Sequence, residues 1–327
     1  MDKILVTGGA GYIGSHVVEV LLNNNKQVRV LDNGMFGLGA LYPFYENTRF
    51  ELINGDLRNI SDLKKSLKGV EGVIHLGGIV GNPACSFDKL TCQDVNVTAT
   101  ERLASVSVEA GISRFVFASS CSVYGYGDDV FTEESALNPV DYYAESKISG
   151  EEVIKQFSSD MVMTNCRFAT VFGASRRMRF DLAVNGMTAS ALSDGVCHVH
   201  GGGQWRPFIH CHDVAKALCK IIFSPESSVI NQTFNIGSDE LNMTLAQLGD
   251  KIIRLVKNST AEIHGALSDN RSYQVSFKKI RESLDFTSSI SIDKGISQII
   301  SLLDSNIIPS PTLNIYNNLK TTEQQAA

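Results

Sequence analysis

The chain has 327 residues, of which 43% are hydrophobic and 20% charged, and its formal net charge is −6. This length suffices for a large core and two lobes, and the composition is ordinary for a soluble globular enzyme. The net negative charge disfavours a nucleic-acid partner. No apolar run nears the roughly 18 residues of a membrane span and no signal peptide is evident, and both observations disfavour a membrane partner. Seven scattered cysteines predict reduced thiols and a cytoplasmic location.

A glycine-rich turn at residues 8–14 follows an apolar strand predicted at residues 3–7 and opens a helix with apolar residues at helical spacing. Gly8 and Gly11 would let the chain turn tightly and bring backbone N–H groups against a pyrophosphate, whose charge suits the positive end of a helix. Gly14 would let that helix pack closely on the strand. Such a turn alone also occurs in other α/β proteins, so the residues that follow it matter.

Asp32 ends a second predicted strand, residues 28–32, at about the 20-residue distance from the glycines that a dinucleotide-binding unit requires. Its carboxylate would accept hydrogen bonds from a ribose 2′,3′-diol and repel a 2′-phosphate. No Lys or Arg follows in residues 33–38 to bind such a phosphate. The unit therefore predicts a dinucleotide site that prefers NAD to NADP.

Strands and helices alternate along the rest of the first two thirds of the chain. This pattern predicts an α/β fold, a Rossmann-type doubly wound parallel sheet with a smaller C-terminal substrate-binding lobe. We expect an NAD-binding domain at 1–173 to which 207–237 return, a substrate lobe from 174–206 and 238–308, and a polar tail at 309–327 that frays. The further predicted strands are 50–53, 72–76, 114–118, 164–168 and 232–236, and the predicted helices are 61–67, 94–110, 142–157, 213–223, 245–256 and 291–303.

Small and polar residues follow the third and fourth predicted strands. Asp56 could accept a hydrogen bond from an adenine amino group; alternatively, it caps the helix at 61–67. Gly77 and Gly78 would let the backbone pass close to a cofactor. Asn96, in the first turn of the helix at 94–110, would tie that turn to the neighbouring strand end.

Tyr143 and Lys147 are four residues apart and would share one face of the helix at 142–157. A tyrosine has a pKa of about 10, and a nearby ammonium group together with a positive nicotinamide ring would lower it toward working pH. Ser120, at the end of the fifth predicted strand, could position a substrate hydroxyl. A Tyr-x-x-x-Lys pair alone is common on surface helices, but here it follows a dinucleotide-binding unit.

Taken together, these motifs resemble those of the extended short-chain dehydrogenase/reductases, specifically the NAD-dependent nucleotide-sugar epimerase/dehydratase family. The similarity extends over nearly the whole chain and implies bound NAD, a nucleoside-diphosphate sugar held by the C-terminal lobe, and a homodimer formed through the helices at 94–110 and 142–157. The matching segments, in order, are Thr7–Gly14, Asp32, Gly55–Leu57, His75–Gly78, Asn96, Ser119–Ser120, Val123–Gly125 and Tyr143 with Lys147.

The resemblance also implies roles for individual residues. Tyr143 would be the catalytic base, Lys147 its ribose-binding partner and Ser120 the hydroxyl that orients the substrate. The expected cofactor-binding residues are Gly8, Gly11, Tyr12, Ile13, Gly14, Asp32, Asn33, Asp56, Leu57, Leu76, Gly77, Gly78, Asn96, Tyr143 and Lys147. The expected substrate-binding residues are Ser120, Cys121, Ser122, Thr170, Arg179, Asn185, Arg206 and Arg271.

Arginines of the C-terminal lobe are expected to hold the nucleotide and its phosphates, since a guanidinium pairs two phosphate oxygens at once. By resemblance, Arg206 would reach the nucleotide and Arg271 the pyrophosphate; the alternative for both is a surface salt bridge. Arg176, Arg177 and Arg179 are weaker candidates, and two of them could simply be solvated.

Two departures from the family pattern bear on the reaction. Dehydratases of the family carry an Asp-Glu pair where this chain has Cys121 and Ser122, and decarboxylating relatives carry a Glu at the position of Ser122. Thr170 replaces an Asn often found there, and Cys121 is more simply a small buried residue than an acid. We therefore expect an epimerase that acts at C4 by transient oxidation. The alternative is a net C4 dehydrogenase or 4-keto reductase, and a 4,6-dehydratase is disfavoured. A non-catalytic NAD-binding regulator is the hypothesis from a different functional class.

Histidines cluster in the sequence at 198, 200, 210 and 212, beside Cys211. No Cys-x-x-Cys accompanies them, and the His-x-His pair alternates as a strand does. The sequence therefore predicts no metal site.

Overall fold

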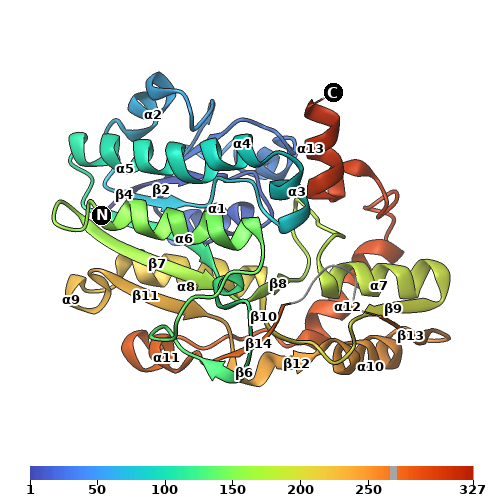
Figure 1. Cartoon of the computed structure of the whole chain (residues 1–327). Helices are drawn as coiled ribbons and strands as arrows, with labels where there is room; N and C mark the ends of the chain where they lie inside the picture. The colour runs from blue at the N-terminus through green and yellow to red at the C-terminus, as the bar shows by residue number, and fades with distance from the viewer. Residues whose placement is uncertain (266–270, 327) are drawn as a thin grey trace.

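The computed structural model describes residues 1–265 and 271–326. A central sheet is covered by helices on both faces, and a smaller lobe lies beside it (Figure 1). The strands are β1 (Lys3–Thr7), β2 (Gln27–Asp32), β3 (Phe50–Asn54), β4 (Gly72–His75), β5 (Arg114–Ser120), β6 (Tyr126–Phe131), β7 (Val162–Phe168), β8 (Thr170–Phe172), β9 (Val196–His200), β10 (Trp205–His210), β11 (Gln232–Ile236), β12 (Asn242–Thr244), β13 (Thr260–His264) and β14 (Ser272–Val275). The helices are α1 (Gly14–Asn23), α2 (Ile60–Leu67), α3 (Asn82–Phe87), α4 (Lys89–Gln93), α5 (Ala99–Glu109), α6 (Tyr142–Lys155), α7 (Ala183–Asp194), α8 (Cys211–Phe223), α9 (Glu226–Val229), α10 (Leu245–Leu255), α11 (Lys278–Leu284), α12 (Ile292–Asp304) and α13 (Asn318–Ala326).

The main sheet has seven strands in the order β11-β7-β5-β4-β1-β2-β3, and all its neighbours pair in parallel. This confirms the predicted doubly wound Rossmann-type sheet, and the strands predicted at 3–7 and 232–236 match residue for residue. The chain leaves β1 in one direction for β2 and β3, and crosses to the other side for β4. In such sheets a ligand binds at this switch point, outside the carboxyl ends of the strands.

Both faces of the sheet are buried, which is why its strands read as continuous apolar runs. On β1, Ile4 and Val6 face one core, where α1 and α8 pack together. Leu5 faces the other core, which α2, α5 and α6 cover. The side-chain alternation of a strand thus distributes one short segment over two hydrophobic layers.

The helix predicted at 94–110 begins differently in the structure. α4 runs into a π-helical turn, Asp94–Thr98, and only then into α5. The helical path starts at Lys89, where the Asp88 side chain accepts a hydrogen bond from the Thr91 N–H. Asn96 lies in the widened turn and is buried, so it is not in a first helical turn. Single π turns of this kind are frequent at functional sites.

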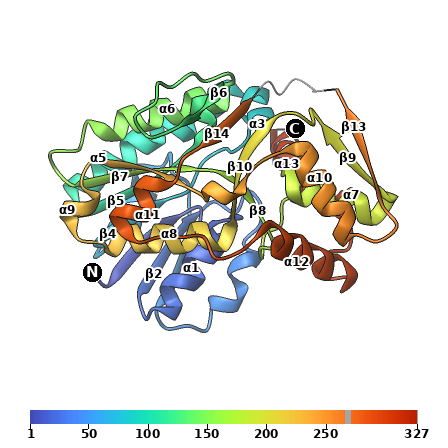
Figure 2. The same ribbon diagram turned by 90° about the horizontal axis from the view of Figure 1, so that it is seen from below.

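The smaller lobe has its own hydrophobic core, formed by β8, β9, β10, β12 and helices α7, α10 and α12. Its sheets are short: β10 pairs with β8 in parallel and with β12 in antiparallel, and β9 pairs with β13 in parallel. Figure 2 shows this lobe beside the carboxyl ends of the main strands. Among the described helices, none combines the length and apolarity needed to cross a bilayer.

The predicted fraying of the C-terminal tail is wrong. Residues 318–326 form α13, which lies against α3 of the main domain (Figure 1). Asn318, Thr321 and Thr322 are buried although they are polar. Their side chains form hydrogen bonds, and buried polar groups that are hydrogen-bonded need not avoid an interior.

Candidate active site

A cavity of about 950 Å³ lies at the carboxyl ends of the main strands and continues into the smaller lobe. Most of the expected site residues line it. Those that do are Gly8, Gly11, Tyr12, Ile13, Gly14, Asp32, Asn33, Asp56, Leu57, Leu76, Gly77, Gly78, Ser120, Tyr143, Lys147, Thr170, Arg179, Arg206 and Arg271. Asn96, Cys121, Ser122 and Asn185 do not line it.

The glycine turn brings two strand ends into close contact. Gly8 has φ +68°, and a Cβ there would lie 2.8 Å from the backbone nitrogen of Gly77. A Cβ on Gly14 would clash with the Gly8 carbonyl, so only glycine lets α1 start directly on the turn. The positive end of α1 therefore faces the cavity with little side-chain cover. This cradle fits the pyrophosphate of a dinucleotide.

Asp32 ends β2 beside this turn. Its carboxylate accepts hydrogen bonds from the N–H groups of Gly34 and Ala10, each over 2.9 Å. Burial raises the pKa of Asp32, and these two backbone donors oppose the rise. The carboxylate is thus fixed at the cavity wall, where it could accept a ribose diol.

Asp56 also lines the cavity, but its carboxylate already pairs with the Arg58 guanidinium at 2.7 Å. This pairing, chiefly through the hydrogen bond, lowers the pKa of Asp56. The alternative role of helix cap is wrong, because the Asn59 side chain accepts the capping hydrogen bond from the Ser61 N–H. Contact between Asp56 and adenine stays a prediction.

Tyr143, Lys147 and Ser120 come together where α6 crosses the end of β5. The Asp141 side chain caps α6, so Tyr143 lies in its first turn. Lys147 donates a hydrogen bond from Nζ to the Ala118 carbonyl over 2.9 Å, and its Nζ lies 5.8 Å from the centre of the Tyr143 ring. The Ser120 hydroxyl lies close enough to the Tyr143 phenol to favour its ionised form, and thus acts to lower the pKa of Tyr143. All three side chains face the cavity.

Burial is the largest cause of the pKa shifts of Tyr143 and Lys147. It lowers the pKa of Lys147 from 10.5 to about 8 and raises the pKa of Tyr143 above its ordinary value. This rise belongs to the protein chain by itself, and the expected fall of the Tyr143 pKa beside a bound nicotinamide ring stays a prediction. The Ser120 hydroxyl and the charge of Arg179 oppose the rise.

Asn96 supports this group from behind. Its side-chain oxygen accepts a hydrogen bond from the Ile79 N–H over 2.8 Å, and its nitrogen donates to the Ile79 carbonyl and to the Ser146 hydroxyl. It thereby ties the segment after β4 to α6, the tie to a strand end that the sequence predicts. Its side chain is used in these bonds and does not reach the cavity as a direct ligand.

Cys121 and Asn185 are fully buried, which corrects their assignment as substrate ligands. The Cys121 thiol donates to the Arg167 carbonyl over 3.2 Å, and burial raises its pKa well above the usual value. Asn185 donates to the Tyr12 hydroxyl and accepts from the Gly173 N–H. Ser122, also buried, donates to the Ser120 hydroxyl over 2.9 Å. Ser122 and Asn185 thus lie outside the cavity and bind residues that line it, Ser120 and Tyr12.

Basic residues lie at the other end of the cavity. Arg206 donates to the Trp205 and Arg271 carbonyls, and Arg271 forms an ion pair with Asp141 at 3.7 Å. Asp269 and Asn270 of the Arg271 motif lie outside the described residues. Arg179 binds Asp181 through two hydrogen bonds, of 3.0 and 2.7 Å.

Arg177 was predicted from the sequence only as one of three weaker candidates for binding the nucleotide and its phosphates. It lines the cavity, its guanidinium lies 4.1 Å from the centre of the Phe36 ring, and it donates to the Asn318 side chain over 2.8 Å. Burial lowers its pKa from 12.5 to about 9. Arg176, by contrast, forms a bidentate pair with Glu19 away from the cavity. Because three arginines lie together at 176–179, the sequence alone could not show which of them lines the cavity.

The comparison with known proteins agrees with this geometry. Residues 4–237 match the model of the NAD dependent epimerase/dehydratase family. The chain belongs to this family. It is an NAD-dependent enzyme of the extended short-chain dehydrogenase/reductase type, and NAD is its cofactor.

Individual members of the epimerase/dehydratase family resemble the chain over almost its full length. An uncharacterized UDP-glucose epimerase of Bacillus subtilis is 30% identical, over 93% of this chain and 98% of the relative. The structure of MoeE5 in complex with UDP-glucuronic acid and NAD is 27% identical, with a TM-score of 0.82 over 93% of this chain and 99% of that chain. UDP-glucuronic acid 4-epimerase from Bacillus cereus shares the fold, with 24% identity and a TM-score of 0.85 over 93% of this chain and 99% of that chain.

α13 adds a wall to the cavity that sequence reasoning missed. The α13 residues that line it are Asn318, Leu319, Thr322 and Gln325, and Asn317 lines it just before the helix. Asn318 donates to the Val80 carbonyl over 3.0 Å, and Gln325 donates to the Met35 carbonyl over 2.7 Å. The helix thus links the segments that follow β2 and β4.

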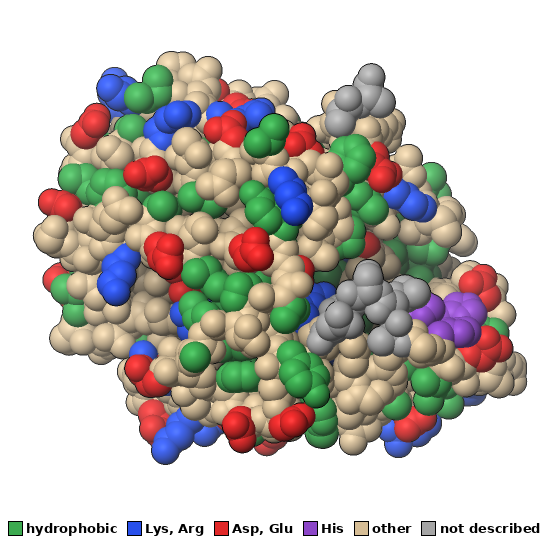
Figure 3. Space-filling model, viewed as in Figure 1, with side chains coloured by type: hydrophobic (Ala, Val, Ile, Leu, Met, Phe, Trp, Pro, Cys, Tyr) green, Lys and Arg blue, Asp and Glu red, His purple; other side chains and the backbone are tan. Residues whose placement is uncertain are grey.

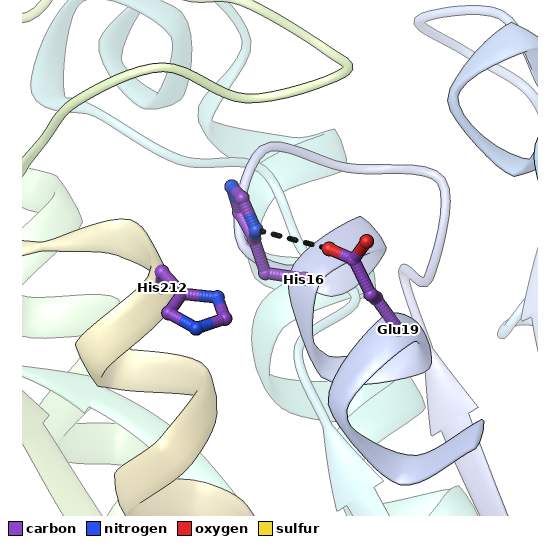
Figure 4. Close-up of side chains that lie close together, drawn as sticks. All are labelled: His16, Glu19 and His212. Atoms are coloured by element: carbon purple, nitrogen blue, oxygen red, sulfur yellow. Dashed lines mark ion pairs between the residues drawn. The ribbon is translucent and has the colours of Figure 1, made fainter. Parts of the chain in front are cut away.

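Histidines gather at two places in the described part of the chain. On β9 and β13, His198 and His264 lie beside Glu262 (Figure 3 shows the histidine patch, with acidic side chains at its edge). On α1 and α8, His16, Glu19 and His212 lie close together (Figure 4). Both groups contain residues far apart in the sequence, which is why the clustered histidines alone did not reveal them.

Proposed function

We propose that the enzyme interconverts the C4 epimers of a nucleoside-diphosphate sugar. The observation that carries the proposal is the Ser120, Tyr143 and Lys147 group facing the cavity without a dehydratase acid beside it. The acidic residues among the described lining residues are Asp32, Asp56, Asp88 and Asp181. Asp32 and Asp56 belong to the glycine-turn end, Asp88 caps α4, and Asp181 is bound by Arg179.

The chain's own residues would handle the proton of the sugar hydroxyl. Tyr143 accepts this proton from the C4 hydroxyl through its phenol oxygen and later returns it. Ser120 holds the hydroxyl in position, and the cationic Lys147 favours the ionised phenol. NAD, when bound, supplies the hydride acceptor, the hydride donor of the return step and a positive charge near the phenol. Inversion requires that the oxidised sugar presents its other face before the hydride returns.

The cavity divides between cofactor and substrate in this proposal. The glycine turn, Asp32 and the segments after β3 and β4 would hold NAD. Arg206, Arg271 and Arg179, with Thr170, would hold the nucleoside-diphosphate sugar, because guanidinium groups suit phosphate oxygens. The ligands of MoeE5, UDP-glucuronic acid and NAD, support a uridine diphosphate sugar as the substrate to test first.

Product analysis tests the proposal. Purified protein is incubated with UDP-glucose, UDP-glucuronic acid, dTDP-glucose and GDP-mannose, and the products are separated by chromatography. We expect a mixture of C4 epimers from one of them, with no net NADH. A 4-keto-6-deoxy product would identify a dehydratase, and a ketone with stoichiometric NADH would identify a dehydrogenase, which the same three residues could also serve. Turnover without any epimer therefore refutes the proposal.

We further propose a cytoplasmic homodimer. All seven cysteines are free thiols, which supports a reducing compartment. α5 and α6 lie side by side on one face of the molecule (Figure 1), so two copies could pack these helices into a four-helix bundle. Size-exclusion chromatography with light scattering tests the dimer, and a monomer at micromolar concentration would contradict it.

A further inference from the structure

The parallel pairing of β9 and β13 brings histidines and a carboxylate together. The register places His198 opposite Glu262 and His200 opposite His264. These strands are more than 50 residues apart in the sequence, so only the fold creates the group. The side chains of His198 and His264 are 41% and 39% exposed, and that of Glu262 is 56% exposed, which leaves the group open to a small ion.

The ligand atoms form a compact triangle. His198 Nδ1 and His264 Nε2 are 3.1 Å apart, and the Glu262 Oε2 atom is 4.0 Å from the first and 3.8 Å from the second. For edges of 3.1, 3.8 and 4.0 Å, the point equidistant from all three atoms lies about 2.1 Å from each. This is within the roughly 2.0–2.2 Å at which imidazole nitrogens and carboxylate oxygens bind Zn²⁺.

We propose that His198, Glu262 and His264 form a binding site for a divalent transition-metal ion such as Zn²⁺. Two imidazoles and one carboxylate suit ions of intermediate softness, and they leave a coordination position open. In the described part of the chain, the ion pairs of Glu262 involve only these two histidines, so no Lys or Arg there competes with the ion.

The second histidine group, His16, Glu19 and His212, is a weaker candidate because an arginine already occupies its carboxylate. Both Glu19 oxygens accept hydrogen bonds from Arg176, at 2.8 and 2.9 Å, so a cation would have to displace a guanidinium. His16 points its Nδ1 toward Glu19 over 3.8 Å (Figure 4). The Nε2 atom of His16 lies 3.0 Å from the Ala174 carbonyl oxygen. This group therefore provides the matched control.

The proposed site has a defined position relative to the active site. His198 and His200 line the same cavity as Arg206 and Arg271, at the end formed by the smaller lobe. His200 stacks on His264, with ring centres 5.0 Å apart, and so supports a ligand without being one. A bound ion would join β9 to β13 at the wall of the cavity. Metal binding does not depend on which reaction the enzyme performs.

Isothermal titration calorimetry with ZnCl₂ tests the site on tag-free, chelator-treated full-length protein. We expect one ion per chain, with binding weakened at least about ten-fold by His264→Ala and by Glu262→Gln. Loss of a residue that only supports a metal ligand already weakens binding by about 10–100-fold, and loss of a ligand itself should cost no less. His212→Gln, in the second group, should bind Zn²⁺ like the wild type. X-ray absorption should show nitrogen and oxygen ligands with imidazole scattering.

Three results would overturn the proposal. They are a wild-type protein that binds no Zn²⁺ at 100-fold excess over protein, a His198→Ala, His264→Ala double variant that still binds normally, or loss of binding in His212→Gln alone. Circular dichroism of each variant verifies that it is folded. The three ligand side chains are partly exposed, so we expect the substitutions to leave the fold intact.

Discussion

Lys147 donates a hydrogen bond to the main-chain oxygen of Ala118 over 2.9 Å, two residues before Ser120. This bond fixes α6 against the end of β5 and so sets the distance between Ser120 and the Tyr143 phenol. A site built on a helix and a strand holds its side chains more precisely than a site built on loops. The catalytic group is thus a product of helix–strand packing.

Replacement of the phenol hydroxyl tests this group. We expect Tyr143→Phe to lower kcat by about 10²–10⁴-fold, as for loss of a general base, with NAD affinity retained. Tyr142→Phe is the matched control, because the Tyr142 hydroxyl bonds to the Lys89 carbonyl outside the cavity. Steady-state kinetics on the epimerised sugar measures both. Equal rates for Tyr143→Phe and the wild type would refute the role of the phenol.

Asp32 should decide between NAD and NADP. Its carboxylate is held by two backbone N–H groups, and a 2′-phosphate would face this negative charge. We therefore expect Asp32→Ala to weaken NAD binding and to raise the NADP-to-NAD affinity ratio by about ten-fold, or about 1.4 kcal/mol. Fluorescence titration with both cofactors measures the ratio. Equal affinity of the wild type for NAD and NADP would contradict this interpretation.

α13 should contribute to cofactor binding. Its residues line the cavity and bond to the segments after β2 and β4, so we expect deletion of residues 317–327 to weaken NAD binding by about ten-fold, equivalent to about 1.4 kcal/mol. Asn318→Ala should reproduce part of the loss. Lys320→Ala, an exposed position on the same helix, is the control and should bind NAD normally. Unchanged NAD affinity after the deletion would show that α13 only covers the surface.

The sequence predicted those features whose residues are contiguous or belong to a spaced motif. β1, the glycine turn and Asp32 lie within about 30 residues, and their pattern reflects local geometry. Tyr143 and Lys147 were found because four-residue spacing defines a helix face.

What the sequence could not show depends on contacts between distant segments. α13 was missed because its buried side chains, such as Asn318 and Thr322, are polar and give no hydrophobic pattern. The role of Arg177 depends on its contacts with Phe36 and Asn318, which are both far away in the chain. The group on β9 and β13 depends in the same way on strand register.

A buried ion pair behind the active site should be important for stability. Glu151 on α6 binds Arg167 on β7 through two hydrogen bonds, of 2.9 and 2.7 Å, and the two side chains are 9% and 7% exposed. We expect Glu151→Ala to lower the free energy of unfolding by about 3–5 kcal/mol, because it leaves the guanidinium buried without its carboxylate. Glu282→Ala, in the exposed pair with Lys278, should change it by less than about 1 kcal/mol. Urea denaturation measures both, and similar effects of the two variants would contradict the prediction.

His16 should make the folded protein sensitive to acid. Burial lowers the pKa of His16 from 6.5 to about 4, so between these two pH values the unfolded chain binds the proton and the folded chain does not. The free energy of unfolding must then fall as the pH falls from 6.5 to 4, by an amount that approaches about 3 kcal/mol for this group. His75, whose pKa burial lowers to about 3, acts in the same direction and stays in place when His16 is changed. We therefore expect His16→Gln, which keeps a donor for the Ala174 carbonyl, to reduce the stability difference between pH 7 and pH 4.5 without abolishing it. Urea denaturation of both proteins at the two pH values measures this difference, and parallel pH profiles would show that His16 is protonated equally in the folded and unfolded states.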